Sequence, residues 1–413
     1  MTIVKEYLDL TEKYKKEYGE KTLVLMQVGS FFEAYGLLDK DDNIYGSDIT
    51  TFAEINEMTI SRKNICVGKA RVVMAGFGLP QLEKYIKKMQ DNGYTIPVYT
   101  QDSPSKNTTR SLNCIFSPGT YFSNETRELS NNTTCIWICI SNSIITKSKE
   151  ITIGISNIDI FTGKTSIFEF NKPFQHNPAT YDELERYISI YNPNECIIIS
   201  NLEINEINDI INYTQINSNK IHKIKTDDTN FVKQIKNSEK QIYQKEVIER
   251  FYPNINSENI INNLQKYCIA FQCFVFLLDF TYKHNPNLVN KISEPIIENY
   301  GDRLVLANHS LKQLNMISDN KQHGKYSSVV NFLNKCVTPM GKREFNYNLL
   351  NPTTNIDTLN TSYNITEHLL TTDWNIYRTN LNNIRDIEKI KRKLIMKKIS
   401  PKDFFMLFET LAT

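Results

Sequence analysis

The pattern of apolar and polar residues divides this chain of 413 residues into three parts. In residues 1–120, apolar positions recur at helical spacing near the start, and a β-prone run follows at 22–28. A second helix is expected from Pro80 to Gly93, with apolar residues at i, i+3, i+4 and i+7, before a strand at 95–99. The first part is therefore predicted to be an α/β domain.

The second part, residues 121–245, begins with three strand-like runs at 134–140, 151–158 and 165–170. A helical segment at 181–191 and an apolar strand at 195–200 come next. This order predicts a second α/β domain with a mixed sheet. Residues 201–245 are rich in Asn, Ile and Lys and have no clear period, so we assign no elements there.

The third part, residues 246–413, has mostly helical patterns. Its segment 266–282 is apolar nearly all round, which predicts a buried helix. A last helix is expected to start at Pro401, with Ser400 as its N-cap. That helix is apolar at 404–411 and has no C-cap, so we expect an all-α region that is incomplete. The other helices are predicted at 327–335, 339–350, 354–370 and 375–396.

Composition excludes several classes of protein. The net charge is only +2, from 48 basic and 46 acidic residues, so this is not a highly basic nucleic-acid coat. The longest apolar run, 268–280, is shorter than a membrane span, and the charged N-terminus lacks a signal peptide's apolar region. We expect a soluble intracellular protein without a membrane partner, in cytoplasm, nucleus, organelle or virus factory. The eight cysteines form no Cys-x-x-Cys pair, so we expect reduced thiols and no metal site.

One stretch combines features that suit contact with DNA bases. The apolar run 23–28 leads into a Gly29-Ser30 turn, and Phe31, Phe32 and Glu33 follow. Residues two apart on a strand project to the same side, so Phe31 and Glu33 can act together. An aromatic ring can wedge into a base stack while a carboxyl group hydrogen-bonds the disturbed base. The competing interpretation is a core Phe pair beside a solvated Glu.

A basic cluster lies near this stretch in sequence. It consists of Arg62, Lys63, Lys69 and Arg71. Such residues can contact DNA phosphates, which adds affinity without sequence specificity. A solvated loop is an equally good interpretation, and the sequence leaves both open.

No catalytic or nucleotide-binding motif is complete. Gly163-Lys164-Thr165 lacks the first Gly of a phosphate-binding loop and lies between two strands, so it is predicted to be a hairpin turn. Gly341-Lys342-Arg343 fails in the same way. Asp159 is the only carboxylate suggestively placed for a nuclease. We therefore expect no enzyme activity, no catalytic residue and no cofactor in this chain.

Several segments, in the same order along nearly the whole chain, resemble the DNA mismatch-recognition family MutS, including a viral or organellar branch. Gly29–Glu33 is similar to the family's Gly-Asp-Phe-Tyr-Glu, in which the aromatic residue and the Glu form a Phe-x-Glu mismatch reader. Other similar segments are Met74–Phe77, Phe116–Thr120, Leu333–Arg343 and Ile384–Lys389. Two departures alter turns: Ser30 replaces the family's Asp, and Gly78 and Pro80 replace its Pro and His.

The resemblance implies a multidomain protein: an α/β mismatch-recognition domain at 1–120, an α/β ribonuclease-H-like connector at 121–245, and an all-α helical core or lever at 246–413. It implies that Phe31 and Glu33 read mismatched or looped double-stranded DNA. The family's ATPase domain, with ATP and Mg²⁺, would lie downstream of residue 413, in the remainder of the protein or in a second MutS subunit. Two alternatives stay open: a split or degenerate module that docks a repair partner, and a ribonuclease-H-like nuclease.

Overall fold

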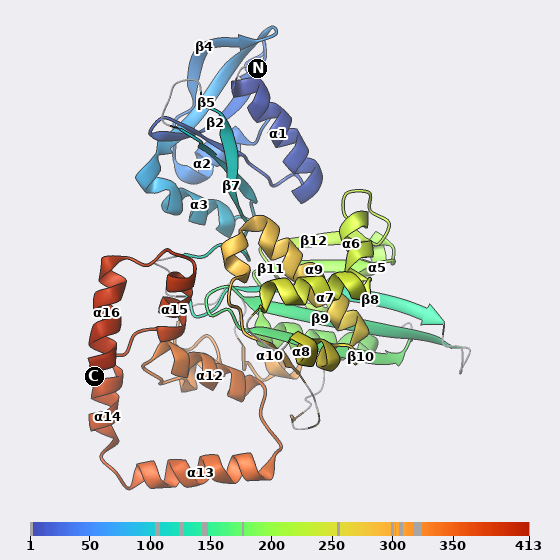
Figure 1. Cartoon of the computed structure of the whole chain (residues 1–413), viewed down its shortest axis with the longest axis vertical. Helices are drawn as coiled ribbons and strands as arrows, with labels where there is room; N and C mark the ends of the chain where they lie inside the picture. The colour runs from blue at the N-terminus through green and yellow to red at the C-terminus, as the bar shows by residue number, and fades with distance from the viewer. Residues whose placement is uncertain are drawn as a thin grey trace.

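The computed structural model describes residues 3–103, 108–123, 128–142, 148–175, 177–253, 257–298, 301, 303–304, 309–317 and 324–412. Figure 1 shows three regions: a first sheet domain (blue to teal), a second sheet domain with its helices (green to yellow), and a helical region (orange to red). In the described part of the chain, no helix combines the length and the apolar character that crossing a membrane requires.

The first sheet domain is built on seven strands. Their order is β4-β5-β2-β1-β6-β7, with β3 paired to the far end of β2. All pairs are antiparallel except β1 with β6. The strands are β1 (Leu25–Val28), β2 (Phe31–Leu38), β3 (Ile44–Tyr45), β4 (Ser61–Val67), β5 (Ala70–Gly78), β6 (Ile96–Gln101) and β7 (Arg110–Phe116).

Helices cover both faces of this sheet. On one face, Tyr7 of α1 (Ile3–Tyr18) meets the ring of Tyr35 edge-on, at 5.3 Å between ring centroids. On the other face, Phe77 lies between Phe52 of α2 (Ile49–Asn56) and Tyr85 of α3 (Leu82–Asp91). The helix expected from Pro80 exists, with a 3₁₀ turn η1 (Leu79–Gln81) before it. The sequence pattern missed β2, β4, β5 and α2. Strands β2 and β5 are mostly buried and α2 is short, so they carry weak periodicity, whereas β4 is an exposed edge strand without an apolar face.

The second sheet has six strands in the order β12-β11-β8-β9-β10-β13. Strands β8, β9 and β10 form an antiparallel meander, and β11 and β12 add in parallel beside β8. The four strands and the helix expected here are all present, and residues 201–245 add α5, β12, α6 and the first residues of α7. The elements are β8 (Asn132–Asn142), β9 (Lys149–Asp159), β10 (Thr165–Pro173), η2 (Pro178–Tyr181), α4 (Asp182–Tyr191), β11 (Glu195–Ser200), α5 (Ile204–Thr214), β12 (Lys220–Lys225), α6 (Val232–Ser238) and α7 (Gln241–Phe251).

The second domain continues beyond the boundary expected at residue 245. The buried helix α9 (Cys268–His284) packs on β8, β9 and β10, and its N-terminus approaches β9 closely at Gly154. A Cβ atom on Gly154 would lie 2.4 Å from the backbone of Ala270, so glycine is required there. Strand β13 (Pro295–Ile297) then pairs with β10. Residues 246–297 therefore complete the second sheet domain, and the all-α boundary at 246 was wrong. Helix α8 (Ser257–Leu264) and the 3₁₀ turn η3 (Pro286–Val289) belong to this part.

The helical region contains α10 (Ser310–Gln313), α11 (Val329–Leu333), α12 (Pro339–Leu350), α13 (Ile356–Leu370), α14 (Trp374–Leu381), α15 (Ile387–Ile395) and α16 (Pro401–Ala412). The single helix expected at 375–396 is two helices, because Asp386 caps a new one. The expected cap at Ser400 is confirmed, since its hydroxyl accepts the Asp403 amide. Helices α13 and α14 bury none of their residues, and in Figure 1 they form an outer frame with α16.

Candidate nucleic-acid interface

A two-residue turn at Gly29-Ser30 joins β1 to β2 and brings Val28 opposite Phe31. Gly29 has φ +59°, a left-handed conformation that glycine adopts without steric cost. Side-chain amides hold the turn: Gln27 Nε2 donates to the Gly29 carbonyl at 3.1 Å, and the Gly29 amide donates to Gln101 Oε1 at 3.2 Å. These bonds stabilise the turn although Ser30 supplies no carboxylate.

The two phenylalanines after the turn lie on opposite faces of β2. Phe32 is buried and packs against Phe77. Phe31 is 53% exposed, and its cross-strand partner Gly78 has no side chain to cover the ring. The core interpretation is therefore right for Phe32 and wrong for Phe31. Exposure of a large aromatic ring at a hairpin end is unfavourable in water and suits a residue that stacks on a ligand.

Glu33 follows Phe31 on the same face but is only 5% exposed. Its Oε2 atom accepts two hydrogen bonds, from the Tyr35 hydroxyl at 2.5 Å and from Lys63 Nζ at 2.7 Å. Lys63 also lies 5.0 Å from the centre of the Tyr35 ring. Burial raises the pKa of Tyr35 well above its usual range, and the bond to Glu33 raises it further, so the hydroxyl keeps its proton. Oε1 accepts no hydrogen bond from any residue that the structure describes.

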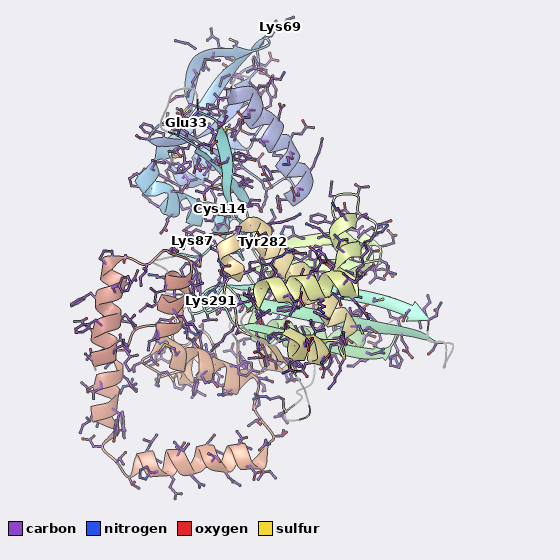
Figure 2. The ribbon with its side chains drawn as sticks, in the orientation of Figure 1. Glu33, Lys69, Lys87, Cys114, Tyr282 and Lys291 are labelled. Carbon is purple, nitrogen blue, oxygen red and sulfur yellow. The ribbon has the colours of Figure 1, made fainter. Side chains whose placement is uncertain are left out.

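The basic cluster expected to contact phosphates does not form one surface with Phe31. Directly opposed residues of an antiparallel pair share a face, and Arg71 opposes Leu38 while Arg62 opposes Val73. Both positions are on the face opposite to Phe31. Arg62 also forms an exposed ion pair with Asp42 at 3.1 Å. Figure 2 places Lys69 at the far tip of the β4–β5 hairpin, away from Glu33. Only Lys63 shares the face of Phe31, and its ammonium is paired with Glu33.

Sequence reasoning missed three residues that complete this site. Tyr35 has a sequence signal, because it lies two residues after Glu33 on the same strand face. Gln101 and Arg110 come from β6 and β7, and Arg110 Nε donates to the Gln27 carbonyl at 2.7 Å. Their role depends on the pairing of β1 with β6 and of β6 with β7, which spacing in the sequence does not reveal.

The incomplete phosphate-loop motifs have other structural roles. Gly163 lies in the β9–β10 hairpin with φ +75°, as expected, and Gly341 lies inside α12. Asp159 is buried, and its oxygens accept the amides of Asn131 and Phe161 and the hydroxyl of Thr162. Within the described residues, no three His, Cys, Asp or Glu side chains are grouped to hold a metal ion. All eight cysteines are free thiols.

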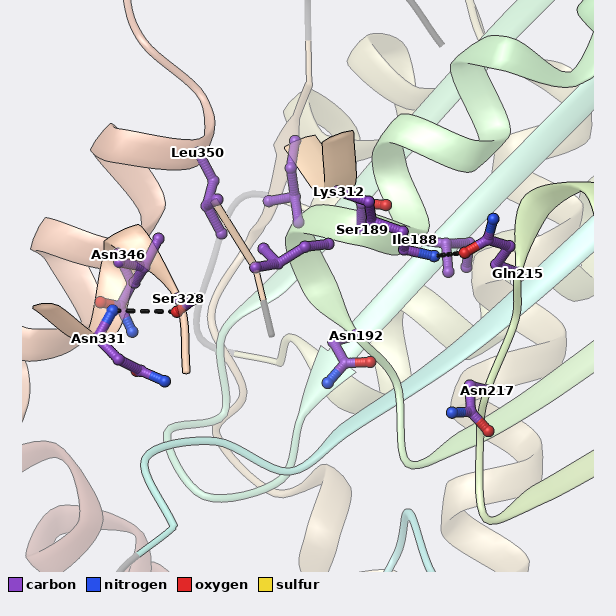
Figure 3. A pocket seen from close by; sticks show the side chains of 13 residues that line it. Ile188, Ser189, Asn192, Gln215, Asn217, Lys312, Ser328, Asn331, Asn346 and Leu350 are labelled. Carbon is purple, nitrogen blue, oxygen red and sulfur yellow. Dashed lines mark hydrogen bonds between the residues drawn. The ribbon is translucent and has the colours of Figure 1, made fainter. Parts of the chain in front are cut away.

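A cavity of about 240 Å³ lies between the second sheet domain and the helical region (Figure 3). Its lining is mostly amide and hydroxyl groups, including Asn192, Asn217 and Ser328. Lys312, which also lines the cavity, donates a hydrogen bond to Gln215 Oε1. Among the lining residues that the structure describes, there is no carboxylate, histidine or cysteine for acid–base, nucleophilic or metal chemistry. The face of Phe31 and Glu33 is the stronger candidate site.

Comparisons with known proteins agree with the sequence motifs. The family model for MutS domain I matches residues 2–125, and that for MutS domain III matches residues 309–413. A putative DNA mismatch repair protein mutS homolog from Acanthamoeba polyphaga mimivirus is 29% identical over 98% of this chain and 38% of its own length. A mitochondrial DNA mismatch repair protein mutS homolog from Sarcophyton glaucum is 24% identical, over 87% of this chain and 39% of its own length.

A bacterial relative, the DNA mismatch repair protein MutS of Caldanaerobacter subterraneus, is 23% identical over 98% of this chain and 42% of its own length. The chain thus spans about two fifths of the length of these curated relatives. Two MutS domain models match the two ends of the chain, and MutS relatives align over nearly all of its length. This chain therefore belongs to the MutS family, which has viral and mitochondrial members among its relatives.

Proposed function

We propose that this chain recognises mismatched or looped duplex DNA in mismatch repair. Phe31 wedges into the minor groove and stacks on a weakly paired base, while Glu33 hydrogen-bonds the displaced base. A mismatch lowers the cost of unstacking, which is otherwise a few kcal/mol per base step. The observation that carries the proposal is the contrast on one strand face between the exposed Phe31 ring and the recessed Glu33 carboxylate.

Backbone contacts would supply affinity but no discrimination. Lys69, at the hairpin tip, is exposed and suits such a contact. Arg62 and Arg71 stay candidates for phosphate contacts as well. Because they lie on the sheet face opposite to Phe31, they would contact a different part of the duplex. Lys63 has a closer role, because its ammonium is 2.7 Å from Glu33.

The remaining expectations follow from family membership and stay proposals. The chain acts by binding, and the family's ATP and Mg²⁺ are held by other residues, in the same protein or a second MutS subunit. The ribonuclease-H-like assignment of the second domain is supported by an antiparallel meander, β8–β10, beside parallel β11 and β12. A nuclease is not favoured, because the Asp159 carboxylate is engaged in fixing the β9–β10 turn. The interaction-module alternative has no specific observation in its favour.

The experiment is a comparison of Phe31→Ala with the unchanged chain on a G·T duplex and its matched A·T control, by fluorescence anisotropy. We expect the unchanged chain to prefer G·T and the variant to lose most of that preference, while weak salt-dependent binding persists. Tyr45→Ala is the matched control, because Tyr45 is 47% exposed on β3 at the other end of the same sheet. Equal mismatch preference in Phe31→Ala and the unchanged chain would refute the proposal.

A further inference from the structure

The cavity in Figure 3 lies where the second sheet domain meets the helical region. One side comes from the end of α4 and the turn between α5 and β12, and the other comes from residues in and around α10, α11 and α12. A hydrogen bond from Lys312 on α10 to Gln215, at the C-cap of α5, joins the two sides. The volume of about 240 Å³ is below the roughly 300–1,000 Å³ of pockets for drug-sized molecules, so the cavity suits a small ligand.

Side-chain amides on both sides of the cavity have hydrogen-bonding groups to spare. Within the described part of the chain, the side chain of Asn192 has no hydrogen-bond partner, and Gln215 accepts a bond from Lys312 while its Nε2 donates none. On the other side, Asn346 Oδ1 accepts a bond from Asn334 at 2.6 Å, and its Nδ2 donates none to the described residues. Because an amide both donates and accepts, this arrangement suits a ligand that does the same.

An apolar surface lies beside the amides. Four lining side chains belong to one small hydrophobic cluster: Ile190, Ile317, Val330 and Leu350. A flat ring can bury one face against such side chains while its edge meets the amides. Among the lining residues that the structure describes, Lys312 is the only charged one, and it bonds the amide oxygen of Gln215. A cationic ligand would find no counter-charge there, so the cavity suits an uncharged ring.

We propose that this cavity binds an uncharged nucleobase, with adenine as the best fit, between the second sheet domain and the helical region. Asn and Gln amides pair with adenine through two hydrogen bonds, donating to N7 and accepting from the N6 amino group. The site contains no residue of the first sheet domain, so it is independent of the proposed reading by Phe31. A free nucleoside and a base of a nucleic acid strand present the same edge, and both are possible sources.

Titration of the full chain with nucleosides tests this, with isothermal titration calorimetry as the measurement. The probes are adenosine, 7-deazaadenosine, which lacks the N7 acceptor, and purine riboside, which lacks the N6 amino donor. We expect a dissociation constant of roughly 0.1–1 mM for adenosine, and binding about fivefold or more weaker for each analogue. If adenosine does not bind at several times that concentration, or if all three nucleosides bind equally, the proposal is overturned.

Two substitutions each remove one amide donor and keep the existing hydrogen bond. Gln215→Glu can still accept from Lys312, and Asn346→Asp can still accept from Asn334. Each should weaken adenosine binding by about fivefold or more, because a carboxylate cannot donate to a ring nitrogen. Asn364→Asp is the matched control, since it adds the same charge on the exposed helix α13 and should leave adenosine binding unchanged. Equal affinity in all three variants would place adenosine elsewhere and overturn the proposal. If a variant does not fold, the three nucleosides with the unchanged chain still decide.

A second experiment separates the two sources of the base. A short single strand of deoxyadenosines is titrated into the unchanged chain, Gln215→Glu and the control Asn364→Asp. If the cavity takes a base of a strand, Gln215→Glu should bind this strand more weakly than Asn364→Asp does. If the cavity takes a free nucleoside, the two variants should bind the strand equally, and only adenosine binding should fall in Gln215→Glu. In both cases, adenosine should slow amide hydrogen exchange near 188–192 and near 342–350, and protection of one side alone would contradict a site between the two regions.

Discussion

Glu33 and Glu195 are both buried, but they differ in how their oxygens are used. Glu195 on β11 leaves neither oxygen open to solvent: Oε1 is 2.6 Å from His222 Nε2, and Oε2 accepts hydrogen bonds from the Gly119 amide at 2.9 Å and from the Ser117 hydroxyl. Glu33 accepts both of its hydrogen bonds from described residues on Oε2, and an exposed aromatic residue lies beside it. Burial alone thus does not distinguish a carboxylate with all its hydrogen bonds inside the protein from one that keeps an oxygen open for a ligand.

The places of the two carboxylates in the fold explain the difference. Glu195 joins three segments: the link between the two sheet domains at 117–120, strand β11 and strand β12. Nearby, Lys220 Nζ reaches across to Thr95 of the first domain at 2.7 Å. A carboxylate with all its bonds inside the protein fixes the joint between domains, whereas one with an open oxygen at a sheet surface is available to a ligand. Substitutions at both sites can test this contrast.

The largest expected effect is on stability, from Glu195→Ala. Removing a buried carboxylate that accepts several hydrogen bonds costs roughly 3–5 kcal/mol of unfolding free energy, because His222, Ser117 and the Gly119 amide stay buried without that acceptor. Urea unfolding measures this. Glu12→Ala is the control, since Glu12 pairs with Lys16 on an exposed helix face and should barely move the unfolding midpoint. A loss as small as that of the control would mean that Glu195 is not a structural joint.

Acid should also weaken the joint at Glu195. Burial lowers the pKa of His284 to about 4. For Glu195, burial opposes ionisation, but the bonds from His222 and Ser117 outweigh it and lower the pKa to about 2. The unfolded chain takes up protons at higher pH than the folded one at both residues. Stability should therefore fall from about pH 6.5 to 4 through His284, and from about pH 4.5 to 2 through Glu195.

Thermal unfolding between pH 7 and pH 4 measures the His284 contribution, which we expect to be on the order of 1–3 kcal/mol. His284→Phe removes the titrating group and keeps an aromatic ring against Tyr18 and Phe280. Its stability should depend less steeply on pH in that range. An unchanged slope in the variant would assign the acid sensitivity to other groups.

The change of glutamate to glutamine should affect DNA binding at residue 33 and stability at residue 195. Glu33→Gln removes a charge next to DNA phosphates, so binding to matched duplex should tighten, by up to roughly tenfold, while mismatch discrimination falls. Its unfolding free energy should change by less than about 1 kcal/mol. Glu195→Gln should instead lower stability and leave the discrimination of the folded chain unchanged. Fluorescence anisotropy measures DNA binding and urea unfolding measures stability for both variants. If the two variants change binding and stability by the same amounts, the proposed difference between Glu33 and Glu195 is wrong.

The smallest effects are expected from removing single hydroxyl donors to each carboxylate. Tyr35→Phe leaves Glu33 with Lys63 and an open Oε1, so stability should fall by about 0.5–1.5 kcal/mol and discrimination should change little. Ser117→Ala leaves part of the fully enclosed Glu195 without a donor and should cost more stability. If Tyr35→Phe proved the more destabilising, Glu33 would resemble a structural carboxylate and the contrast would break.

Several elements could be predicted because their signal is local. The strands of the meander β8–β10 are rich in Ile, Thr and aromatic residues, α9 is apolar nearly all round, and Ser400 with Asp403 makes a cap within four residues. The Gly163 hairpin follows from its flanking strands. Strand β2 was missed, because seven of its eight residues are buried and such a strand shows no alternation. Helix α9 was placed in the wrong domain. Its apolar pattern shows that the helix is buried, but it does not show that the helix packs on the second sheet.

The sequence by itself determined the family and the order of two sheet domains followed by helices, and it singled out Phe31 and Glu33 as candidates, because these depend on ordered motifs and local periodicity. Only the tertiary structure decided that Phe31 is exposed while Phe32 is core, that Lys63 pairs with Glu33 rather than facing outward, and that β13 completes the second sheet. Lys63 and Glu33 lie 30 residues apart, on strands that never pair directly but are both bonded to β5. Such contacts depend on strand order and register, which arise from the packing of the whole sheet and leave no periodic mark in the sequence.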